Sequence, residues 1–207
     1  MPRNKLTKKK IFLAAVDSFA EKSFKHCTMQ EVADKVDIKA PSIYKHFANK
    51  KEILTEIFKY YQENLNKQRM PVEKVIEAID NEPLNKVFSK LFITFETEDE
   101  YILMMKISKI VIDMSYKNKD AKKVFQIVFI EEPTKYLNDV FVKLIDSGKI
   151  KPFDYKSLTF QIIAFSRMIF EISALNGIDR KETDTRYNNG IAMLASGFER
   201  AELVVNK

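Results

Sequence analysis

The side chains that could take part in chemistry are concentrated in one short stretch, IKAPSIYKHFANKKEIL, at residues 38–54. This stretch combines a serine, a tyrosine, a histidine and several lysines with apolar residues at helical spacing. Lysine can meet phosphates or guanine edges, serine can bond base edges or phosphate, and tyrosine can reach a sugar-phosphate backbone. The stretch therefore has the chemistry of a nucleic-acid contact, with an ordinary solvated face as the alternative.

The sequence offers no competing catalytic or metal-binding pattern. Its only histidines are His26 and His46, no histidine, cysteine and carboxylate set has metal-ligand spacing, and no glycine-rich phosphate loop is present. A single cysteine, Cys27, excludes an internal disulfide. It is expected to be an inert buried thiol, with redox sensing as the alternative. We predict no catalytic residue, no metal site and no cofactor, and a protein that is not an enzyme.

The basic excess of the chain lies in its first quarter. The whole chain has a net charge of +6, but residues 1–51 carry +7 and residues 52–207 carry −1. This asymmetry is expected of a small polyanion-binding module joined to a neutral body. The alternative is a charged N-terminus without a partner. We predict a DNA-binding domain at residues 1–51 and a larger domain at residues 52–207.

Two segments of the sequence bear on where the protein is located in the cell. The first residues, MPRNKLTKKK, lead into an amphipathic stretch rather than the apolar run of a signal peptide, which predicts a cytoplasmic protein. The longest apolar segment, SLTFQIIAFSRMIFEISALNG, holds Arg167 and Glu171 near its centre. Charges are costly in hydrocarbon, so this segment is predicted to be buried in protein and not to span a membrane.

Apolar residues recur every three or four positions, and few glycines and prolines interrupt them, which predicts an all-α fold. A first helix is expected from Thr7, acting as N-cap, to Lys22. A second should begin at Thr28, which can form a capping box with Glu31. Pro41 suits the first turn of a third helix. Later helices are expected at residues 50–67, 72–80, 84–97, 100–117, 119–147 with an interruption around Pro133, 155–176 and 184–205.

Two short helices separated by a turn of about four residues, after a longer first helix, have the layout of a helix-turn-helix. On a helical wheel the third helix turns Ala40, Ile43 and Phe47 toward the core. The opposite face is small, polar and basic, and consists of Pro41, Ser42 and Lys45, flanked by Lys39, Tyr44 and His46. Such a face fits a DNA major groove.

The run TMQEVADKVDIKAPSIYKHFANKKEIL, residues 28–54, resembles the DNA-binding signature of the tetracycline-repressor (TetR) family of bacterial transcriptional regulators. A threonine opens the second helix, an apolar pair follows it, a Tyr-x-x-Phe pair ends the recognition helix and a lysine opens the fourth helix. In this sequence these are Thr28, Val32 with Ala33, Tyr44 with Phe47, and Lys50.

Two positions depart from the family pattern. Asp37 stands where the family often has a glycine, and aspartate tolerates left-handed geometry better than most residues. Lys39 stands where a capping serine or threonine is frequent, so it removes a cap and adds a DNA-facing charge. The resemblance implies backbone contacts and base readout by a set that we predict as Thr28, Lys39, Ala40, Ser42, Tyr44, Lys45, His46 and Lys50.

The second domain holds bulky aromatic and methionine-containing stripes suited to an adaptable apolar cavity. Ordinary core packing is the alternative for any one of these side chains. The resemblance implies an inducer pocket in this region. We predict that an apolar or aromatic small-molecule effector contacts Phe88, Phe92, Phe95, Leu103, Ile107, Ile110, Met114, Phe125 and Phe129.

The helix expected at residues 155–176 is apolar on two sides, so one side can meet the core while the other needs a partner. Together with the last helix it would form a four-helix homodimer interface. A monomer with a thick core is the alternative. The predicted interface is Leu158, Ile162, Phe165, Ile169, Ile172, Tyr187, Gly190, Ile191, Leu194, Gly197 and Phe198, and the second stripe on the first of these helices is Phe160, Ala164, Met168 and Leu175.

These features favour a homodimeric, ligand-responsive transcriptional repressor that binds a palindromic operator in double-stranded DNA. One alternative is a helical lipid- or drug-binding protein whose basic end touches a membrane, and a less favoured one is a hydrolase that uses the apolar cavity. Salt-dependent binding to duplex DNA with a defined footprint separates the first interpretation from both others.

Overall fold

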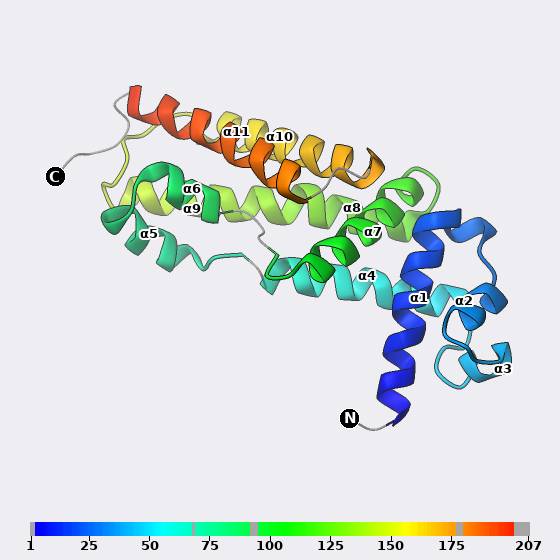
Figure 1. Ribbon diagram of the computed structural model, residues 1–207. Coiled ribbons are helices and arrows are strands. Elements are labelled where there is room, and N and C mark those ends of the chain that lie inside the picture. The colour runs from blue at the N-terminus through cyan, green and yellow to red at the C-terminus, as the bar shows by residue number, and fades with distance from the viewer. Residues whose placement is uncertain (1–2, 68, 92–94, 177–179, 201–207) are drawn as a thin grey trace. The chain divides into compact units, whose positions relative to one another are not determined.

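The computed structural model describes residues 3–67, 69–91, 95–176 and 180–200, and its elements in these ranges are all helices (Figure 1). The predicted all-α fold is confirmed. The helices are α1 (Arg3–His26), α2 (Met29–Lys35), α3 (Ala40–Ile43), α4 (Lys50–Lys67), α5 (Val72–Asn81), α6 (Leu84–Lys90), α7 (Glu98–Ser115), α8 (Lys119–Gln126), the π-helical segment η1 (Ile127–Glu131), α9 (Glu132–Asp146), α10 (Tyr155–Asn176) and α11 (Arg180–Arg200).

Most predicted helices agree with these bounds, and three differ. The last one, predicted at residues 184–205, begins at Arg180, and residues 201–205 lie outside the described part of the chain. Thr7 lies inside α1, which begins at Arg3, so the predicted N-cap at Thr7 is wrong. The basic run at residues 8–10 continues the helix because lysine is a good helix former. The helix predicted at residues 84–97 is shorter, since α6 ends at Lys90.

The chain divides into two compact units. Unit 1 comprises residues 1–64 and 99–125, and unit 2 comprises residues 65–98 and 126–207. Unit 1 therefore joins the first three helices and most of α4 with nearly all of α7 and α8. The division predicted after residue 51 concerns function rather than compactness and stays a prediction.

In unit 1, polar bonds attach α7 to the helices of the N-terminal region. The hydroxyls of Tyr61 on α4 and Ser108 on α7 share a buried hydrogen bond of 2.6 Å. Lys106 Nζ lies 2.7 Å from Asp17 Oδ1 of α1, and Lys109 Nζ donates to the Ala20 carbonyl oxygen at 2.9 Å. Burial raises the pKa of Tyr61, which keeps its hydroxyl neutral. These bonds make α7 part of the same body as α1.

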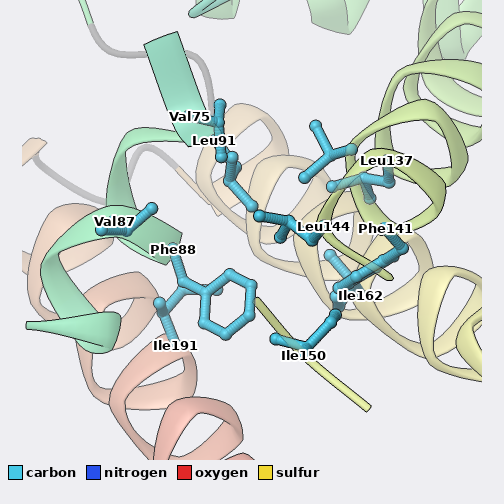
Figure 2. Packing of buried hydrophobic residues seen from close by; sticks show 11 residues of the cluster. Val75, Val87, Phe88, Leu91, Leu137, Phe141, Leu144, Ile150, Ile162 and Ile191 are labelled. Carbon is cyan, nitrogen blue, oxygen red and sulfur yellow. The ribbon is translucent and has the colours of Figure 1, made fainter. Parts of the chain in front are cut away.

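Unit 2 has an apolar core of its own, built from α5, α6, α9, α10 and α11. Figure 2 shows side chains of these helices converging on one cluster. Phe141 is fully buried there, with its ring centroid 5.5 Å from that of Phe153 and 6.3 Å from that of Phe88. The further members of the cluster are Val75, Val87, Leu91, Leu137, Val140, Leu144, Ile150, Ile162 and Ile191.

The interruption predicted around Pro133 is present as the π-helical segment η1, and α9 starts with Pro133 in its first turn. Proline has no N–H and its ring clashes with the carbonyl four residues earlier, which disrupts α-helical bonding. A π turn relieves this conflict by widening the helix, and here the Glu132 amide donates to the Ile127 carbonyl oxygen.

Ser23 interrupts α1 with φ 66° and ψ 153°, a conformation that is essentially restricted to glycine. We expect Ser23→Gly to raise the free energy of unfolding by about 1 kcal/mol. Relief of strain of this kind contributes about 1–3 kcal/mol, and the greater entropy of glycine in the unfolded chain offsets part of it. Thermal and urea unfolding followed by circular dichroism would measure the gain. Ser23→Ala is the control: it keeps the Cβ, removes the hydroxyl that lies 3.2 Å from His26 Nδ1, and should give no gain.

Candidate nucleic-acid interface

The N-terminus of α2 is built by the predicted capping box. The Thr28 side chain accepts a hydrogen bond from the Glu31 amide, and Glu31 Oε2 accepts one from the Thr28 amide at 2.7 Å. Lys22 Nζ lies 2.7 Å from the other carboxylate oxygen of Glu31. These bonds, led by that with Lys22, lower the pKa of Glu31 to about 2, so the box stays charged and intact at neutral pH. The prediction for α2 is confirmed, and the box orients Thr28 at its exposed N-terminus.

The turn between α2 and α3 depends on Asp37. Its φ is 53°, the left-handed geometry that the sequence led us to expect at this position. The Ile38 amide then donates to the Ala33 carbonyl oxygen at 3.1 Å, which closes the turn. Val32 and Ala33 are fully buried beneath it. This turn fixes the angle at which α3 leaves α2.

The short helix α3 presents the polar face that was predicted for it. Ile43 and Phe47 are buried, whereas Lys39, Pro41 and Lys45 are exposed. Tyr44 is 54% exposed, which is high for a tyrosine, because this residue usually buries much of its ring. Ala40, Ser42 and His46 are half-buried. The Phe47 amide donates to the Ile43 carbonyl oxygen, so helical bonding continues past the last residue of α3.

Lys39 occupies the N-cap position of α3 without a capping side-chain bond, and Pro41 lies in the first turn. Both points agree with the sequence analysis. Proline offsets the missing cap, because it has no N–H to satisfy and its φ suits the helix. The Lys39 side chain is exposed, so an anionic partner could reach its ammonium.

Lys50 is engaged inside the chain, which the sequence did not indicate. Its ammonium donates to the carbonyl oxygens of Phe24 and Cys27, both at 2.7 Å, and lies 4.5 Å from the centroid of the Phe24 ring. The Phe24 carbonyl lies in the last turn of α1 and the Cys27 carbonyl directly after it, where a cation is favourable. Thr28 and Lys50, both predicted to contact DNA, thus also have structural partners, and their DNA contacts stay predictions.

Cys27 lies under this corner and is buried. Burial raises the pKa of its thiol, an effect that disfavours the reactive thiolate. This environment supports the interpretation of an inert thiol. Among the residues that the structure describes, no group of histidine, cysteine and carboxylate side chains has the arrangement of a metal site.

The predicted effector contacts are divided between the two units. Leu103, Ile107, Ile110, Met114 and Phe125 belong to unit 1, and Phe88, Phe95 and Phe129 belong to unit 2. Phe92 lies outside the described residues. Ile107 and Ile110 are fully buried, and Phe88 is part of the unit 2 core. The effector site stays a prediction.

Most side chains of the predicted dimer interface pack within their own chain. Ile162, Ile169 and Ile191 are buried, and Leu158, Ile172, Tyr187 and Leu194 are half-buried. The ring of Phe165 covers Gly190 so closely that a Cβ there would overlap it. Gly197 has open space around it, and the side chain of Phe198 is outside the described part.

The second stripe of α10 is exposed at its three described members, and the side chain of its fourth, Leu175, lies outside the described part. Phe160 is 74% exposed and Met168 is 53% exposed, with the exposed Ala164 between them. On α11, Met193 is 76% exposed. Within the described residues, no helix has the combination of length and hydropathy required to cross a bilayer.

Taken together, the fold and this site define an all-helical protein with an N-terminal helix-turn-helix. The sequence profile of the family described as "Bacterial regulatory proteins, tetR family" matches residues 11–57. This range runs from α1 to the second turn of α4 and contains the whole DNA-contacting set that we predicted. Residues 11–57 therefore carry the helix-turn-helix DNA-binding domain of the tetR family of bacterial regulatory proteins, and the resemblance to that family is confirmed.

Other comparisons agree with this assignment. A protein of Bacillus subtilis (strain 168), named as the uncharacterized HTH-type transcriptional regulator YerO, is 26% identical over 136 residues, which are 65% of this chain and 46% of that protein. The alignment thus spans less than half of the relative's length.

Solved structures share the fold. A TetR family transcriptional regulator from Pseudomonas syringae pv. tomato superimposes with a TM-score of 0.59 at 14% identity, over 96% of this chain and 98% of that chain. A transcriptional regulator (TerR/AcrR family) from Aquifex aeolicus VF5 gives a TM-score of 0.61 at 16% identity, over 91% and 99%. At these identities the likeness concerns the fold alone.

Proposed function

We propose that the protein is a transcriptional regulator that binds an operator in duplex DNA through the exposed face of α3. The observation that carries this proposal is the combination of exposed Lys39, Tyr44 and Lys45 with the buried anchors Ile43 and Phe47 on one short, fixed element. Lysines meet phosphates or guanine edges in a major groove, and an exposed tyrosine can bond the backbone. The match of residues 11–57 to the tetR family supports the same conclusion.

Binding should depend on salt in the way that phosphate neutralisation requires. We expect Lys45→Ala to weaken operator binding and to reduce the slope of log affinity against log salt by about 0.9 for each phosphate that is no longer neutralised. Tyr44→Ala should weaken binding by removing a neutral bond to the backbone, with little change of slope. Fluorescence anisotropy with fragments selected from genomic DNA would measure both.

Lys59→Ala is the control for these variants, because Lys59 is an exposed lysine of α4 outside the predicted DNA-contacting set. It should leave affinity and slope unchanged. Unchanged binding by folded Tyr44→Ala and Lys45→Ala proteins would contradict the placement of α3 on DNA.

We infer that the regulator acts as a homodimer, with the exposed stripe of α10 and the neighbouring face of α11 at the contact. Phe160, Ala164 and Met168 are spaced four residues apart and so share one face of α10, and α11 packs beside it. Large apolar side chains left exposed at helical spacing are typical of an interface. A dimer would place two recognition helices on half-sites about 34–36 Å apart, which favours a palindromic operator.

We also propose that an apolar or aromatic effector releases the operator. Three helices, α4, α7 and α8, run without a break across the boundary between the units. A ligand that favours one arrangement of the units over another must therefore change the separation of the recognition helices in a dimer. Coupling of this kind is about 1–3 kcal/mol and reciprocal, so operator DNA must weaken effector binding by the same factor.

Met114→Ala tests the effector proposal. Met114 is a half-buried, flexible side chain near the end of α7, and we expect its truncation to blunt release by hydrophobic effectors while DNA binding without effector changes little. Operator binding would be titrated with a panel of apolar and aromatic compounds. Ile102→Ala, at an exposed position of the same helix, is the control. If saturating concentrations of every bound compound left operator affinity unchanged, the regulator would be constitutive.

A further inference from the structure

A second basic surface lies in unit 1, outside the helix-turn-helix. Residues 116–123, with the sequence YKNKDAKK, form the turn that follows α7 and the start of α8. Lys117, Lys119, Lys122 and Lys123 are all exposed, and we call these four the turn lysines. Tyr116 beside them is 84% exposed. Among the described ion pairs, none includes a turn lysine. The surface is therefore open, positive and partly aromatic.

The placement of these charges is unfavourable for the fold itself. Lys119 and Lys122 lie within the first four residues of α8, at the positive end of its dipole, where Asp120 is the single acidic residue of the first turn. Lys119 also has like charges at the i+3 and i+4 positions, an arrangement that destabilises a helix. The start of α8 is nevertheless capped, because Asn118 Oδ1 accepts from the Ala121 amide at 2.9 Å. Lysines at such a site are best explained by an anionic partner.

The turn lysines are fixed relative to the DNA-binding face. The ion pair from Lys106 to Asp17 and the hydrogen bond from Lys109 to Ala20 hold α7 along the C-terminal half of α1. Figure 1 shows the turn between α7 and α8 near the end of α1 from which the chain passes to α2. That end leads to Thr28, where the family resemblance implies a contact with the DNA backbone. The turn lysines therefore belong to the same unit as α3 and lie near the end of α1 that leads to α2.

We propose that the turn lysines bind the phosphates of duplex DNA flanking the operator, as a second, sequence-independent contact of each subunit. This inference rests on the proposed DNA-binding function. Duplex DNA is favoured over other anions because the lysines move with the recognition helix and would reach the same duplex. Phosphate contacts of this kind add affinity and salt dependence without base preference. Tyr116 can add a hydroxyl contact to the backbone.

The test compares two DNA lengths. A duplex limited to the protected footprint and the same duplex extended by about one helical turn, ~10 base pairs, at each end would be titrated with the full-length protein at several salt concentrations. The test variant carries glutamine at all four turn lysines. The matched control carries glutamine at Lys74, Lys135, Lys151 and Lys156, which are exposed lysines of unit 2 and give the same change of net charge.

We expect the parent protein and the control to bind the extended duplex about tenfold more tightly than the short one, with a steeper salt slope. The test variant should bind both lengths alike, keep the affinity for the short duplex, and melt at the same or a higher temperature. A melting temperature that does not fall shows that the test variant is still correctly folded. A loss of length dependence would then reflect lost contacts with DNA.

Three results would overturn the inference. If the affinities of the parent and the test variant depended equally on DNA length, the turn lysines would make no flanking contact, and the proposed operator recognition by α3 would be unaffected. Lysine-dependent sedimentation with phosphatidylglycerol vesicles, without any length dependence on DNA, would assign the surface to an anionic membrane. If neither protein bound duplex DNA of either length, the proposed function itself would fail together with this inference.

Discussion

Replacing both Phe160 and Met168 by arginine is expected to convert the protein into folded monomers that bind operator DNA at least about a hundredfold more weakly. A second half-site bound by the same molecule can raise apparent affinity by about 10²–10⁴, and a monomer forfeits that gain. Both side chains are more than half exposed in the single chain, so arginine can be accommodated without disturbing the unit 2 core. In a dimer, the same arginines would bury unpaired charges in an apolar contact.

Sedimentation velocity would report the mass, circular dichroism the helicity, and anisotropy the DNA affinity. Val142→Arg is the matched control, because Val142 is an exposed apolar residue on α9, outside the proposed contact. It should leave the dimer intact. A double-arginine protein that still sediments as a dimer would rule out this face of α10 as the interface.

The choice between the two stripes of α10 shows where sequence reasoning reaches its limit. The pattern established that the helix is apolar on two sides, and its bounds at residues 155–176 agree with the structure. Periodicity cannot say which side faces inward, because both stripes repeat with the same spacing. Only the contacts of Ile162, and the closeness of the Phe165 ring to Gly190, show that the predicted interface stripe packs in its own chain.

The helix-turn-helix was more predictable because its determinants are local. The capping box of Thr28 and Glu31, the left-handed turn at Asp37 and the proline in the first turn of α3 each involve residues at most five positions apart. Bonds between distant parts of the chain left no such signal. Lys109 lies 89 residues from Ala20, and the two meet only in the fold. The partners of Lys50 were hidden for the same reason.

Lys50→Met is expected to destabilise the DNA-reading corner without removing a bond to phosphate. The Lys50 ammonium binds the carbonyls of Phe24 and Cys27, so it ties the start of α4 to the end of α1 and to the segment that follows it. Hydrogen bonds from charged groups contribute about 1.5–3 kcal/mol each in favourable cases. Because the site is only half-buried, we expect a total loss near the lower end, about 2 kcal/mol, and a fall in melting temperature of roughly 4–8 °C.

Salt dependence distinguishes this structural role from the backbone contact that the family resemblance implies. Measured well below the melting temperature, Lys50→Met should weaken operator binding while the slope of log affinity against log salt stays that of the parent protein. Lys51→Met, at the exposed neighbouring lysine, is the control and should leave the melting temperature unchanged. A Lys50→Met protein with parental stability and a slope smaller by about 0.9 would instead place the ammonium on a phosphate.

DNA would then have to displace the Phe24 and Cys27 carbonyls from the ammonium, so the corner would loosen on binding, and amide hydrogen exchange at residues 24–28 would increase in the complex. If Lys50 is structural, exchange at these amides should fall or stay constant on binding DNA.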